Sequence, residues 1–315
     1  MTLSEIPTFT LPKTGDKIPS LGFGSGTAWK IQKRARPESE KNEPVEELIQ
    51  GISNAISAGF NHIDTAEAYS THYEVGQGIK RSGIPRSELF ITDKYSPGSP
   101  GTKKTSGPYE TLQNALKTLE LDYVDLYLLH TPRISPETVG ITLEEAWLQV
   151  EKLYKDGLVK NVGVSNFSIE YLERINKVAT IIKPQVNQIE FHAYLQGQTP
   201  KILEYAKEND ILIEAYSPLA PLFRARPGPL DNILGELETK YGKSESQILL
   251  RWVYQNGIVP LTTSSKVERL QSALEIFTFE LEQEDFDKIT SIGKEKIARH
   301  FASDLYGKYD NELYN

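Results

Sequence analysis

The sequence predicts an α/β fold, a (β/α)8 TIM barrel with an N-terminal β-hairpin and with extra loops and helices. Eight short apolar runs alternate with segments of helical periodicity, and strict alternation is typical of parallel strands joined by helical crossovers. A doubly wound open sheet could also use such units, but eight is the number that closes a barrel of roughly 250 residues. The 315 residues therefore hold one barrel with some surplus chain.

The eight apolar runs have the length of buried strands. In chain order they span residues 21–24, 62–65, 90–94, 124–130, 162–165, 186–190, 212–217 and 258–262. In a barrel wound in sequence order each strand lies beside the next one, so residues at their carboxyl ends gather at one rim.

The segments between the runs carry the signals of helix starts, helix faces and helix stops. Two of them begin with the spacing of a capping box, in Thr142 with Glu145 and in Ser244 with Gln247. Both segments are followed by a glycine, at 157 and 257, where helices commonly end. An earlier helix is marked by apolar residues on one face, namely Val45, Leu48, Ile49, Ile52 and Ile56.

The remaining chain is assigned to additions on a single domain that spans residues 1–315. We expect the hairpin at about 8–19, the barrel at about 20–280 and a C-terminal loop at about 294–315. Residues 221–229 (PLFRARPGP) are expected to form an irregular insertion after the seventh strand, because prolines and a glycine interrupt regular structure.

The composition excludes several classes of protein. The 43 acidic and 35 basic side chains give a net charge of −8, whereas general nucleic-acid binders carry the opposite balance. The chain has no cysteine, which excludes disulfides, thiolate catalysis and cysteine zinc sites. No apolar run reaches the length of a membrane span, and residues 1–5 lack the basic start of a signal peptide. We therefore expect a cytoplasmic protein that binds neither nucleic acid nor membrane and has no obligatory protein partner.

The glycine-rich stretch at 22–27 (GFGSGT) is similar to a phosphate-binding loop but lacks its pattern. A dinucleotide-binding loop needs G-x-G-x-x-G between a full strand and a helix, with an acidic residue about 20 positions further on. Here the spacing is G-x-G-x-G, and residues 28–37 (AWKIQKRARP) do not read as a helix packed on a strand. We assign the stretch to the end of the first strand, where small residues let the backbone approach a ligand and bring Trp29 to the pocket.

Polar residues at three neighbouring strand ends are the candidate functional groups. Asp64, Lys94 and His130 lie at the ends of the second, third and fourth strands, and Tyr69 follows Asp64 by five residues. Catalytic residues of such barrels come from the carboxyl ends of the strands. Buried Asp, Lys and His side chains are costly unless they pair, so we expect these side chains to converge at one rim.

Two other interpretations of these residues remain open at this point. An Asp–Lys pair is commonly a structural ion pair, and a single His at a strand end is commonly a satisfied polar group. His62 and Asp64, two positions apart, could also be metal ligands. The five histidines, at 62, 72, 130, 192 and 300, form neither the His-x-His nor the Glu-x-x-His spacing that would support a metal. We expect no metal site.

A proton-donating site accounts for more of these residues at once. Tyrosine has a free pKa of about 10, and a neighbouring ammonium such as that of Lys94 lowers it. Asp64 keeps the lysine charged and in position, and a neutral His130 can donate to a carbonyl oxygen near Tyr69. Groups that protonate a carbonyl oxygen, without a nucleophile or a metal, imply hydride delivery from a separate cofactor.

The same residues lie in motifs that resemble the aldo-keto reductase family. The matching stretches run in order from about residue 9 to about residue 281 and include HIDTAEAY at 62–69, LDYVDLYLLH at 121–130, GVSNF at 163–167, QVNQIE at 185–190 and AYSPL at 215–219. The stretches TDKYSP at 92–97, TTSSK at 262–266 and LYGKY at 305–309 are similar to the fungal NADPH-dependent branch that reduces α-keto amides and conjugated polyketones, including ketopantoyl lactone.

The resemblance implies roles for the site residues. Asp64, Tyr69, Lys94 and His130 match the catalytic tetrad of the family, with tyrosine as the acid. The resemblance also implies NADPH/NADP+ as the cofactor, held by residues from several strand ends. These residues are Gly26, Thr27, Asp64, Ser165, Asn166, Gln188, Tyr216, Ser217, Leu219, Thr262, Thr263, Ser264, Ser265, Lys266 and Arg269.

Parts of the cofactor are assigned to parts of that set. Residues 165, 166 and 188 match positions that hold the nicotinamide amide, and Tyr216 matches the aromatic residue stacked on the nicotinamide ring. Residues 217 and 219 match positions along the pyrophosphate. Residues 264–269 fall in the segment that binds the adenosine 2′-phosphate, and two cations with several hydroxyls suit a phosphate dianion. This favours NADPH over NADH.

The resemblance implies an NADP(H)-dependent oxidoreductase acting on CH–OH groups, which reduces a carbonyl compound to the alcohol. The substrate would contact Trp29, Tyr69, His130, Thr131 and the C-terminal loop. Thr131 stands where many relatives have tryptophan, and Thr263 where many have lysine, so the substrate and part of the adenosine contacts should differ. The alternative is an NADPH-binding redox sensor with little turnover, although a pure binder has no need of an aligned tetrad. By the same resemblance we expect a monomer.

Overall fold

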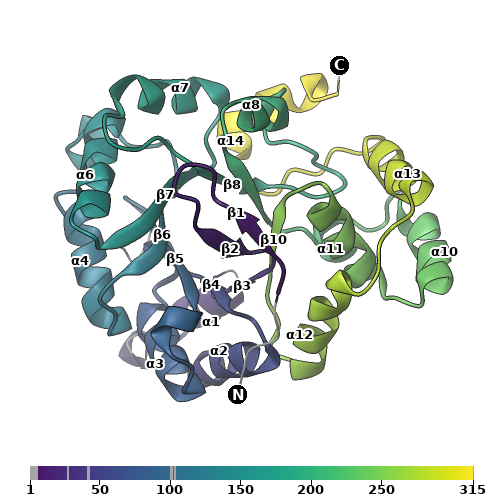
Figure 1. Ribbon diagram of the computed structural model, residues 1–315, viewed down its shortest axis with the longest axis horizontal. Helices are drawn as coiled ribbons and strands as arrows, with labels where there is room; N and C mark the ends of the chain where they lie inside the picture. The colour runs from purple at the N-terminus through teal and green to yellow at the C-terminus, as the bar shows by residue number, and fades with distance from the viewer. Residues whose placement is uncertain (1–5, 27, 41–42, 100–101, 103, 315) are drawn as a thin grey trace.

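The eight predicted strands close into one parallel barrel, which confirms the predicted fold class (Figure 1). The computed structural model describes residues 6–26, 28–40, 43–99, 102 and 104–314. The barrel strands are β3 (Gly22–Gly24), β4 (His62–Asp64), β5 (Phe90–Tyr95), β6 (Val124–Leu129), β7 (Val159–Ser165), β8 (Val186–Glu190), β9 (Leu212–Tyr216) and β10 (Val259–Thr262). Each strand pairs with the next in the chain, and β10 closes the ring against β3.

Strand register brings the candidate residues to one rim. Asp64 is paired with Thr92 of β5, two residues before Lys94, and Lys94 is paired with Leu128 of β6, two residues before His130. Because side chains alternate along a strand, residues two apart point to the same face. The Asp64, Lys94 and His130 side chains therefore point the same way at neighbouring strand ends.

Helices surround the strands on the outside of the barrel in Figure 1. The α-helices are α1 (Ala28–Arg34), α2 (Glu46–Ala58), α3 (His72–Ser82), α4 (Pro108–Leu119), α5 (Pro136–Val139), α6 (Leu143–Lys155), α7 (Ile169–Val178), α8 (Ile202–Glu208), α9 (Ala220–Phe223), α10 (Asp231–Tyr241), α11 (Glu245–Gln255), α12 (Val267–Leu274), α13 (Gln283–Gly293) and α14 (Ser303–Tyr306). Short 3-10 turns are η1 (Glu38–Glu40), η2 (Glu67–Tyr69), η3 (Arg86–Glu88), η4 (Glu275–Phe277) and η5 (Gly307–Glu312).

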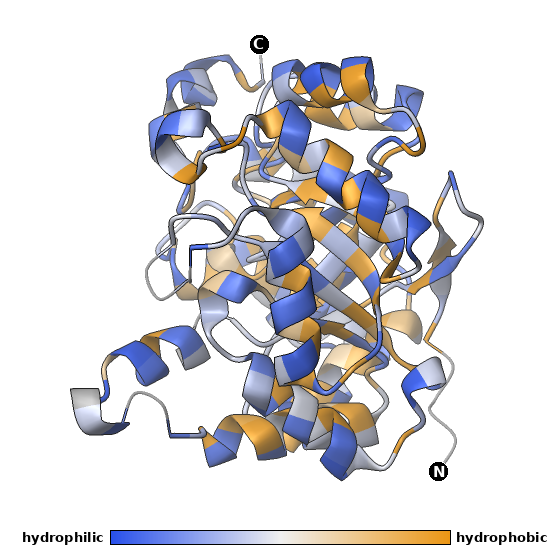
Figure 2. Cartoon of the chain, turned by 90° about the vertical axis from the view of Figure 1, so that its left-hand side faces the viewer, coloured by the Kyte–Doolittle hydropathy of each residue, from blue (hydrophilic) through white to orange (hydrophobic). Residues whose placement is uncertain are grey.

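Both predicted capping boxes are confirmed. At the start of α6 the Thr142 hydroxyl accepts from the Glu145 backbone N–H at 3.1 Å, and the Glu145 carboxylate accepts from the Thr142 N–H at 2.8 Å. A reciprocal pair of the same kind opens α11. The inward face of α6 carries fully buried Trp147, and Figure 2 shows hydrophobic residues concentrated on the strands and on the inner sides of the helices.

The predicted N-terminal hairpin is present and covers the amino-terminal end of the barrel. Its strands β1 (Thr8–Thr10) and β2 (Lys17–Pro19) are antiparallel and lie across the ring of strands in Figure 1. Buried Leu11 and Ile18 pack on Phe90 and Val186, the first residues of β5 and β8. The Thr14 hydroxyl donates to the Asn161 side chain at 2.6 Å. The hairpin therefore closes the end opposite to the rim that holds Asp64 and Lys94.

Two connections differ from the predictions. Residues 28–34 form helix α1, although the sequence predicts no helix there. Contacts with residues distant in the chain hold this helix in place. Lys33 donates to Glu74 at 2.6 Å and to the Ser70 carbonyl at 2.7 Å, both after β4. The insertion at 221–229 is partly regular, since its first residues belong to α9.

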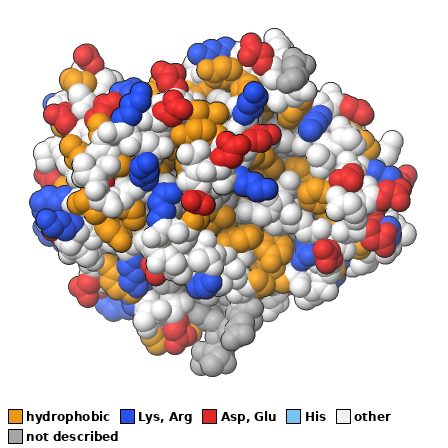
Figure 3. All heavy atoms as spheres, turned by 45° about the horizontal axis from the view of Figure 1, so that its top comes forward, with side chains coloured by type: hydrophobic (Ala, Val, Ile, Leu, Met, Phe, Trp, Pro, Cys, Tyr) orange, Lys and Arg blue, Asp and Glu red, His pale blue; other side chains and the backbone are white. Residues whose placement is uncertain are grey.

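Charges of both signs are interspersed on the face shown in Figure 3, with hydrophobic side chains between them. Neither sign forms a continuous field on this face, which agrees with the modest net charge of −8. Among the helices of the described ranges, none is long and apolar enough to cross a membrane.

Candidate active site

A cavity of about 920 Å³ lies at the carboxyl ends of the strands. Each of the eight barrel strands contributes at least one lining residue, within its last three positions or directly after its end. The residues from these strand ends are Gly24, Asp64, Ser96, His130, Asn166, Gln188, Tyr216 and Thr262. The cavity therefore occupies the position in which barrel enzymes place their chemistry.

The four predicted catalytic residues come together at the base of this cavity. Lys94 Nζ donates to Asp64 Oδ1 at 2.6 Å and to the Thr65 carbonyl at 2.9 Å, and the Lys94 side chain is fully buried. The same Nζ lies 5.1 Å from the centre of the Tyr69 ring. The Tyr69 and His130 rings meet edge to face with their centres 5.8 Å apart, and both line the cavity.

Burial and charge act in opposite directions on these groups. Burial alone would lower the pKa of Lys94, but Asp64 and the other acidic groups around it raise that pKa above its usual value, so the ammonium is retained. Burial raises the pKa of Tyr69, and Lys94 lowers it only in part. We expected Lys94 to bring the tyrosine pKa down. The direction of its effect is as expected, but desolvation outweighs it, so Tyr69 stays protonated at neutral pH.

His130 is neutral and oriented by a residue that the sequence analysis missed. Burial, together with the charges of Lys94 and Lys30, holds the pKa of His130 well below its usual value. Ser96 Oγ lies 2.5 Å from His130 Nδ1. Donation from the Ser96 hydroxyl to Nδ1 would place the proton of the neutral ring on Nε2, where it can be donated to a ligand. Ser96 lies two residues after Lys94, so both side chains point to the same face of the strand. This spacing could have identified Ser96 from the sequence.

The glycine stretch serves the site through close packing. A Cβ on Gly26 would lie 2.8 Å from two carbons of the Tyr69 ring, closer than non-bonded atoms approach. Gly26 therefore makes room for the tyrosine. Thr27, which was expected to contact the cofactor, lies outside the described residues.

Trp29, which was expected to line the pocket, does not do so in the described structure. Its side chain is 8% exposed and belongs to the hydrophobic core, where it packs toward Gly51 of α2. Helix α1 turns Trp29 inward and presents Lys30 and Ile31 to the cavity instead. Thr131 lines the cavity as expected.

Polar residues after β7 and β9 form one edge of the cavity. The Tyr216 hydroxyl donates to Asn166 Oδ1 at 2.7 Å, and Asn166 Nδ2 donates to the His130 carbonyl at 3.0 Å. Asn166 and Ser217 both have positive φ angles, of 62° and 56°, which turn the chain sharply at the strand ends. Ser165 Oγ donates to the Gln188 carbonyl at 2.8 Å and is buried behind this edge.

Glu214 of β9 is a second residue that the sequence analysis missed. Gln188 Nε2 donates to Asp64 Oδ2 and to Glu214 Oε2, both at 2.9 Å, so one amide joins two carboxyl groups. All three side chains are buried. Glu214 lies two residues before Tyr216 in an apolar run, so both side chains point to the same face of the strand. A carboxyl group at such a position could have been noticed in the sequence. With both amide hydrogens used, the Gln188 amide oxygen is left to accept from a ligand.

Glu214 holds a proton in the folded protein. Burial, reinforced by the Asp64 charge, raises the pKa of Glu214 to about 8, although Gln188 and Lys94 act against this shift. His62, whose Nε2 lies 3.7 Å from Glu214 Oε1, is neutral because burial lowers its pKa to about 3. His62 Nε2 is hydrogen bonded to Thr92 Oγ1 at 3.0 Å. Protonated Glu214 therefore leaves Asp64 as the charged carboxylate of the network.

We expect Glu214→Gln to remove part of the pH dependence of stability. The unfolded chain releases the Glu214 proton near pH 4.5, whereas the folded protein keeps it until about pH 8. The free energy of unfolding of the wild type should therefore fall as pH rises between these values, and the variant should lack this component. Urea denaturation at a series of pH values measures it. Glu204→Gln, on an exposed position of α8, is the control, and parallel curves for wild type and Glu214→Gln would contradict the prediction.

The segment after β10 holds the predicted phosphate-binding residues. Thr262 and Thr263 line the cavity, whereas residues 264, 265, 266 and 269 lie beyond it. Ser264 Oγ accepts from the Lys266 backbone N–H at 3.0 Å, just before α12 begins. Lys266 and Arg269 are exposed, and neither has an acidic partner within the described part of the chain. Two cations beside a helix start are available to an anion.

The polar, aromatic and cationic side chains in and beside the cavity fit a nicotinamide dinucleotide phosphate. Gln188 and Tyr216 line the cavity together with Tyr69 and His130. Lys30 lines the cavity without a carboxylate partner among the described residues, and Lys266 and Arg269 follow the lining residues Thr262 and Thr263 in the chain. An amide oxygen, an aromatic ring and cations are the partners that the groups of such a dinucleotide require.

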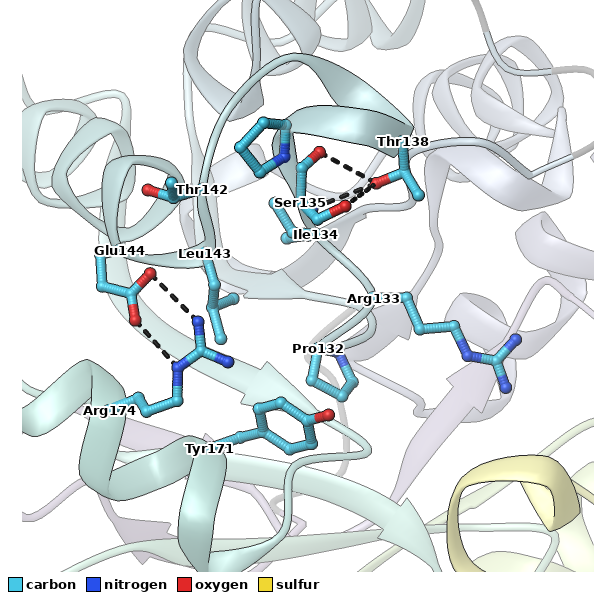
Figure 4. Close-up of a pocket in the computed structure, with 11 residues that line it drawn as sticks. Pro132, Arg133, Ile134, Ser135, Thr138, Thr142, Leu143, Glu144, Tyr171 and Arg174 are labelled. Carbon is cyan, nitrogen blue, oxygen red and sulfur yellow. Dashed lines mark hydrogen bonds and ion pairs between the residues drawn. The ribbon is translucent and has the colours of Figure 1, made fainter.

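A second cavity of about 340 Å³ lies beside the mouth, between α5, α6 and α7 (Figure 4). Two of its charged groups are already paired, since Arg174 forms a two-point ion pair with Glu144 at 2.9 and 3.2 Å. Arg133 points away from this pair in Figure 4 and also lines the large cavity. The second cavity therefore adds a wall to the mouth rather than a separate set of reactive groups.

Comparison with known proteins finds one family over most of the chain. The model of the Aldo/keto reductase family matches residues 21–294. A Saccharomyces cerevisiae protein described as NADPH-dependent alpha-keto amide reductase is 46% identical over 308 residues, which cover 96% of each chain. A Schizosaccharomyces pombe protein described as NAD/NADP-dependent indole-3-acetaldehyde reductase is 40% identical over 91% of this chain and 96% of its own.

A solved structure supports the same assignment. The NADP complex of a Bombyx mori aldo-keto reductase superposes with a TM-score of 0.80 at 29% identity, covering 98% of this chain and 99% of its own. Together with the sequence matches, it confirms the predicted family and the predicted class of oxidoreductase. The chain belongs to the aldo/keto reductase family.

Proposed function

We propose that this protein is an NADPH-dependent carbonyl reductase with Tyr69 as its general acid. The observation that carries the proposal is the buried Lys94–Asp64 ion pair beside Tyr69, whose ring faces the cavity next to His130. Tyr69 donates the proton to the carbonyl oxygen, and His130 Nε2 donates a hydrogen bond to the same oxygen. Lys94 stabilises the phenolate that remains, and Asp64 keeps Lys94 charged and in place.

The cofactor is NADPH/NADP+, which supplies the hydride when bound. Gln188 and Asn166 would hold its amide, the Tyr216 ring would stack on the nicotinamide, and Lys266 with Arg269 would bind the 2′-phosphate. The hairpin and the buried side chains around Lys94 keep water from reaching the site through the amino-terminal end of the barrel. The exclusion of water strengthens the charge interactions in the site.

The substrate is an α-keto amide, a diketone or conjugated polyketone such as ketopantoyl lactone, or a related aldehyde or ketone. The name of the 46% identical relative supports the first of these. The mouth carries two exposed hydrophobic residues, Ile31 and Phe223, with Phe301 and Leu305 further in. These side chains suit a carbonyl compound with an apolar substituent. We further propose that the protein works as a cytoplasmic monomer.

Oxidation of NADPH with a panel of α-keto amides, dicarbonyls and ketopantoyl lactone tests the function. We expect turnover with at least one class, followed by loss of NADPH absorbance and identification of the alcohol. Tight binding of NADPH without turnover of any panel member would contradict the proposal and would favour a redox sensor.

We expect Lys266→Ala combined with Arg269→Ala to weaken NADPH binding by about 100-fold to 10,000-fold, because hydrogen bonds to a charged phosphate are worth about 1.5–3 kcal/mol each and about 1.4 kcal/mol is tenfold. NADH lacks the 2′-phosphate, so its affinity should change little. Titration of both cofactors by fluorescence gives the two dissociation constants. Lys80→Ala, an exposed change on α3, is the control, and an equal loss of NADH affinity in the double variant would refute the assignment.

A further inference from the structure

A second cluster of metal-type ligands lies outside the proposed catalytic groups. Glu190 ends β8, His192 follows two residues later, and His300 comes from the segment between α13 and α14. One ligand atom from each residue lies within 4.8 Å of the other two. Glu190 and His192 are 1% and 0% exposed, and His300 is half-buried. No short histidine spacing marks this cluster in the sequence, because His300 is distant from Glu190 and His192.

Hydrogen bonding inside the cluster is incomplete. His192 Nε2 lies 3.4 Å from Glu190 Oε1, whereas a charge-assisted N–H···O bond is about 2.7–2.9 Å long. His192 Nδ1 and His300 Nε2 are buried, and neither has a hydrogen-bond partner among the residues described. Buried polar atoms are nearly always bonded, so the unsatisfied His300 Nε2 and the long contact between His192 Nε2 and Glu190 point to a missing ligand between these side chains.

The local charges leave the site able to accept a cation. Arg299 is the nearby cation, and its charge is offset. It pairs with Asp310 at 2.6 Å and donates to the Gln198 carbonyl at 2.9 Å.

We propose that Glu190, His192 and His300 bind a divalent transition-metal ion of the zinc type. Two imidazole nitrogens and one carboxylate oxygen are a ligand set that Zn2+ takes, with a fourth position for water. In a tetrahedral site with bonds of about 2.0 Å, two ligand atoms lie about 3.3 Å apart. The 3.4 Å between His192 Nε2 and Glu190 Oε1 matches that separation. The ligand atom of His300 lies within 4.8 Å of the other two and would move closer to complete the set.

The ion would tie the C-terminal loop to the barrel. The Glu190 carboxylate already accepts the backbone N–H groups of His300 at 3.0 Å and Phe301 at 2.9 Å. The Phe301 ring packs edge to face on Tyr216, with centres 5.4 Å apart, and lines the large cavity. A metal bound to His300 and Glu190 therefore adds a third link between the end of β8 and a wall of that cavity.

Titration of the untagged, metal-free protein with Co2+ tests the site without turnover. We expect the visible absorption bands of four-coordinate Co2+ to saturate at one ion per chain and to be displaced by Zn2+. The bands should be lost in His300→Ala, a change in a half-buried loop residue, and kept in His72→Gln, a histidine outside the cluster. Absence of the bands in the wild type, or their persistence in His300→Ala, would overturn the proposal.

Hydrogen exchange of the C-terminal loop tests the tie. One equivalent of Zn2+ should slow exchange of the His300 and Phe301 amides in the wild type and leave it unchanged in His300→Ala. Equal exchange with and without Zn2+ in the wild type would show that no such tie forms. Because neither measurement uses NADPH or a carbonyl compound, their outcome is independent of the reductase activity proposed above.

Discussion

Substitution Tyr69→Phe should lower kcat by about 100-fold to 10,000-fold, the usual contribution of a general acid. Phenylalanine keeps the ring that packs on Gly26 and meets His130 but has no proton to donate. The proton must then come from water or from His130. Burial holds the pKa of His130 well below its usual value, so the ring is neutral, and a neutral imidazole N–H is a poor acid. Initial rates with saturating NADPH and carbonyl substrate measure the loss.

The affinity for NADPH separates a chemical defect from a structural one. Tyr69→Phe should bind NADPH with nearly the wild-type dissociation constant, because the phenol oxygen contributes a proton rather than a cofactor contact. Tyr73→Phe, at a 43% exposed position of α3, removes a hydroxyl outside the cavity and should retain the wild-type rate. Retention of most activity in Tyr69→Phe would exclude Tyr69 as the acid.

Substitution Lys94→Met should both inactivate and destabilise the protein. Methionine fills a similar volume, but it leaves Asp64 buried without its ammonium partner at 2.6 Å. Breaking a buried ion pair by removing one partner costs about 3–5 kcal/mol of unfolding free energy. The activity should fall as well, because the phenolate of Tyr69 loses the adjacent charge. Urea denaturation with an unchanged slope measures the first effect, and turnover measures the second.

A double variant distinguishes the two roles of the pair. Lys94→Met combined with Asp64→Asn removes both charges, so no carboxylate is left unpaired, and Asn can still accept from Gln188. Stability should recover in part, whereas activity should not. If the double variant were as unstable as Lys94→Met, the loss of stability would come from packing rather than from the unpaired charge.

The parts of the fold that could be predicted depend on short-range patterns. Capping boxes span three residues, and apolar runs span four to eight, so the strands and α6 and α11 could be located from local sequence. Counting the strands then gave the barrel, and strand order placed Asp64, Lys94 and His130 at one rim. No comparable local pattern marks α1, because Lys33 and its partner Glu74 lie far apart in the chain.

The parts of the site that could not be predicted depend on contacts across the barrel. Glu214 matters because Gln188, on the adjacent strand β8, links it to Asp64, and the sequence alone does not show that register. Trp29 was assigned to the pocket from its position after the glycines, but the direction of a side chain on a short helix follows from what packs against it. The predicted lowering of the Tyr69 pKa was wrong for a related reason. Burial raises this pKa, and the degree of burial is set by the whole fold.

The proton on Glu214 also affects the heat of unfolding. At pH 7 the folded protein holds this proton, because the pKa of Glu214 is about 8, and the unfolded chain releases it to the buffer. Tris gives off much heat when it takes up a proton, whereas phosphate gives off little. A calorimeter should therefore record a smaller apparent unfolding enthalpy in Tris than in phosphate, and Glu214→Gln should reduce the difference. One buried carboxyl group in the barrel makes the measured enthalpy a property of protein and buffer together.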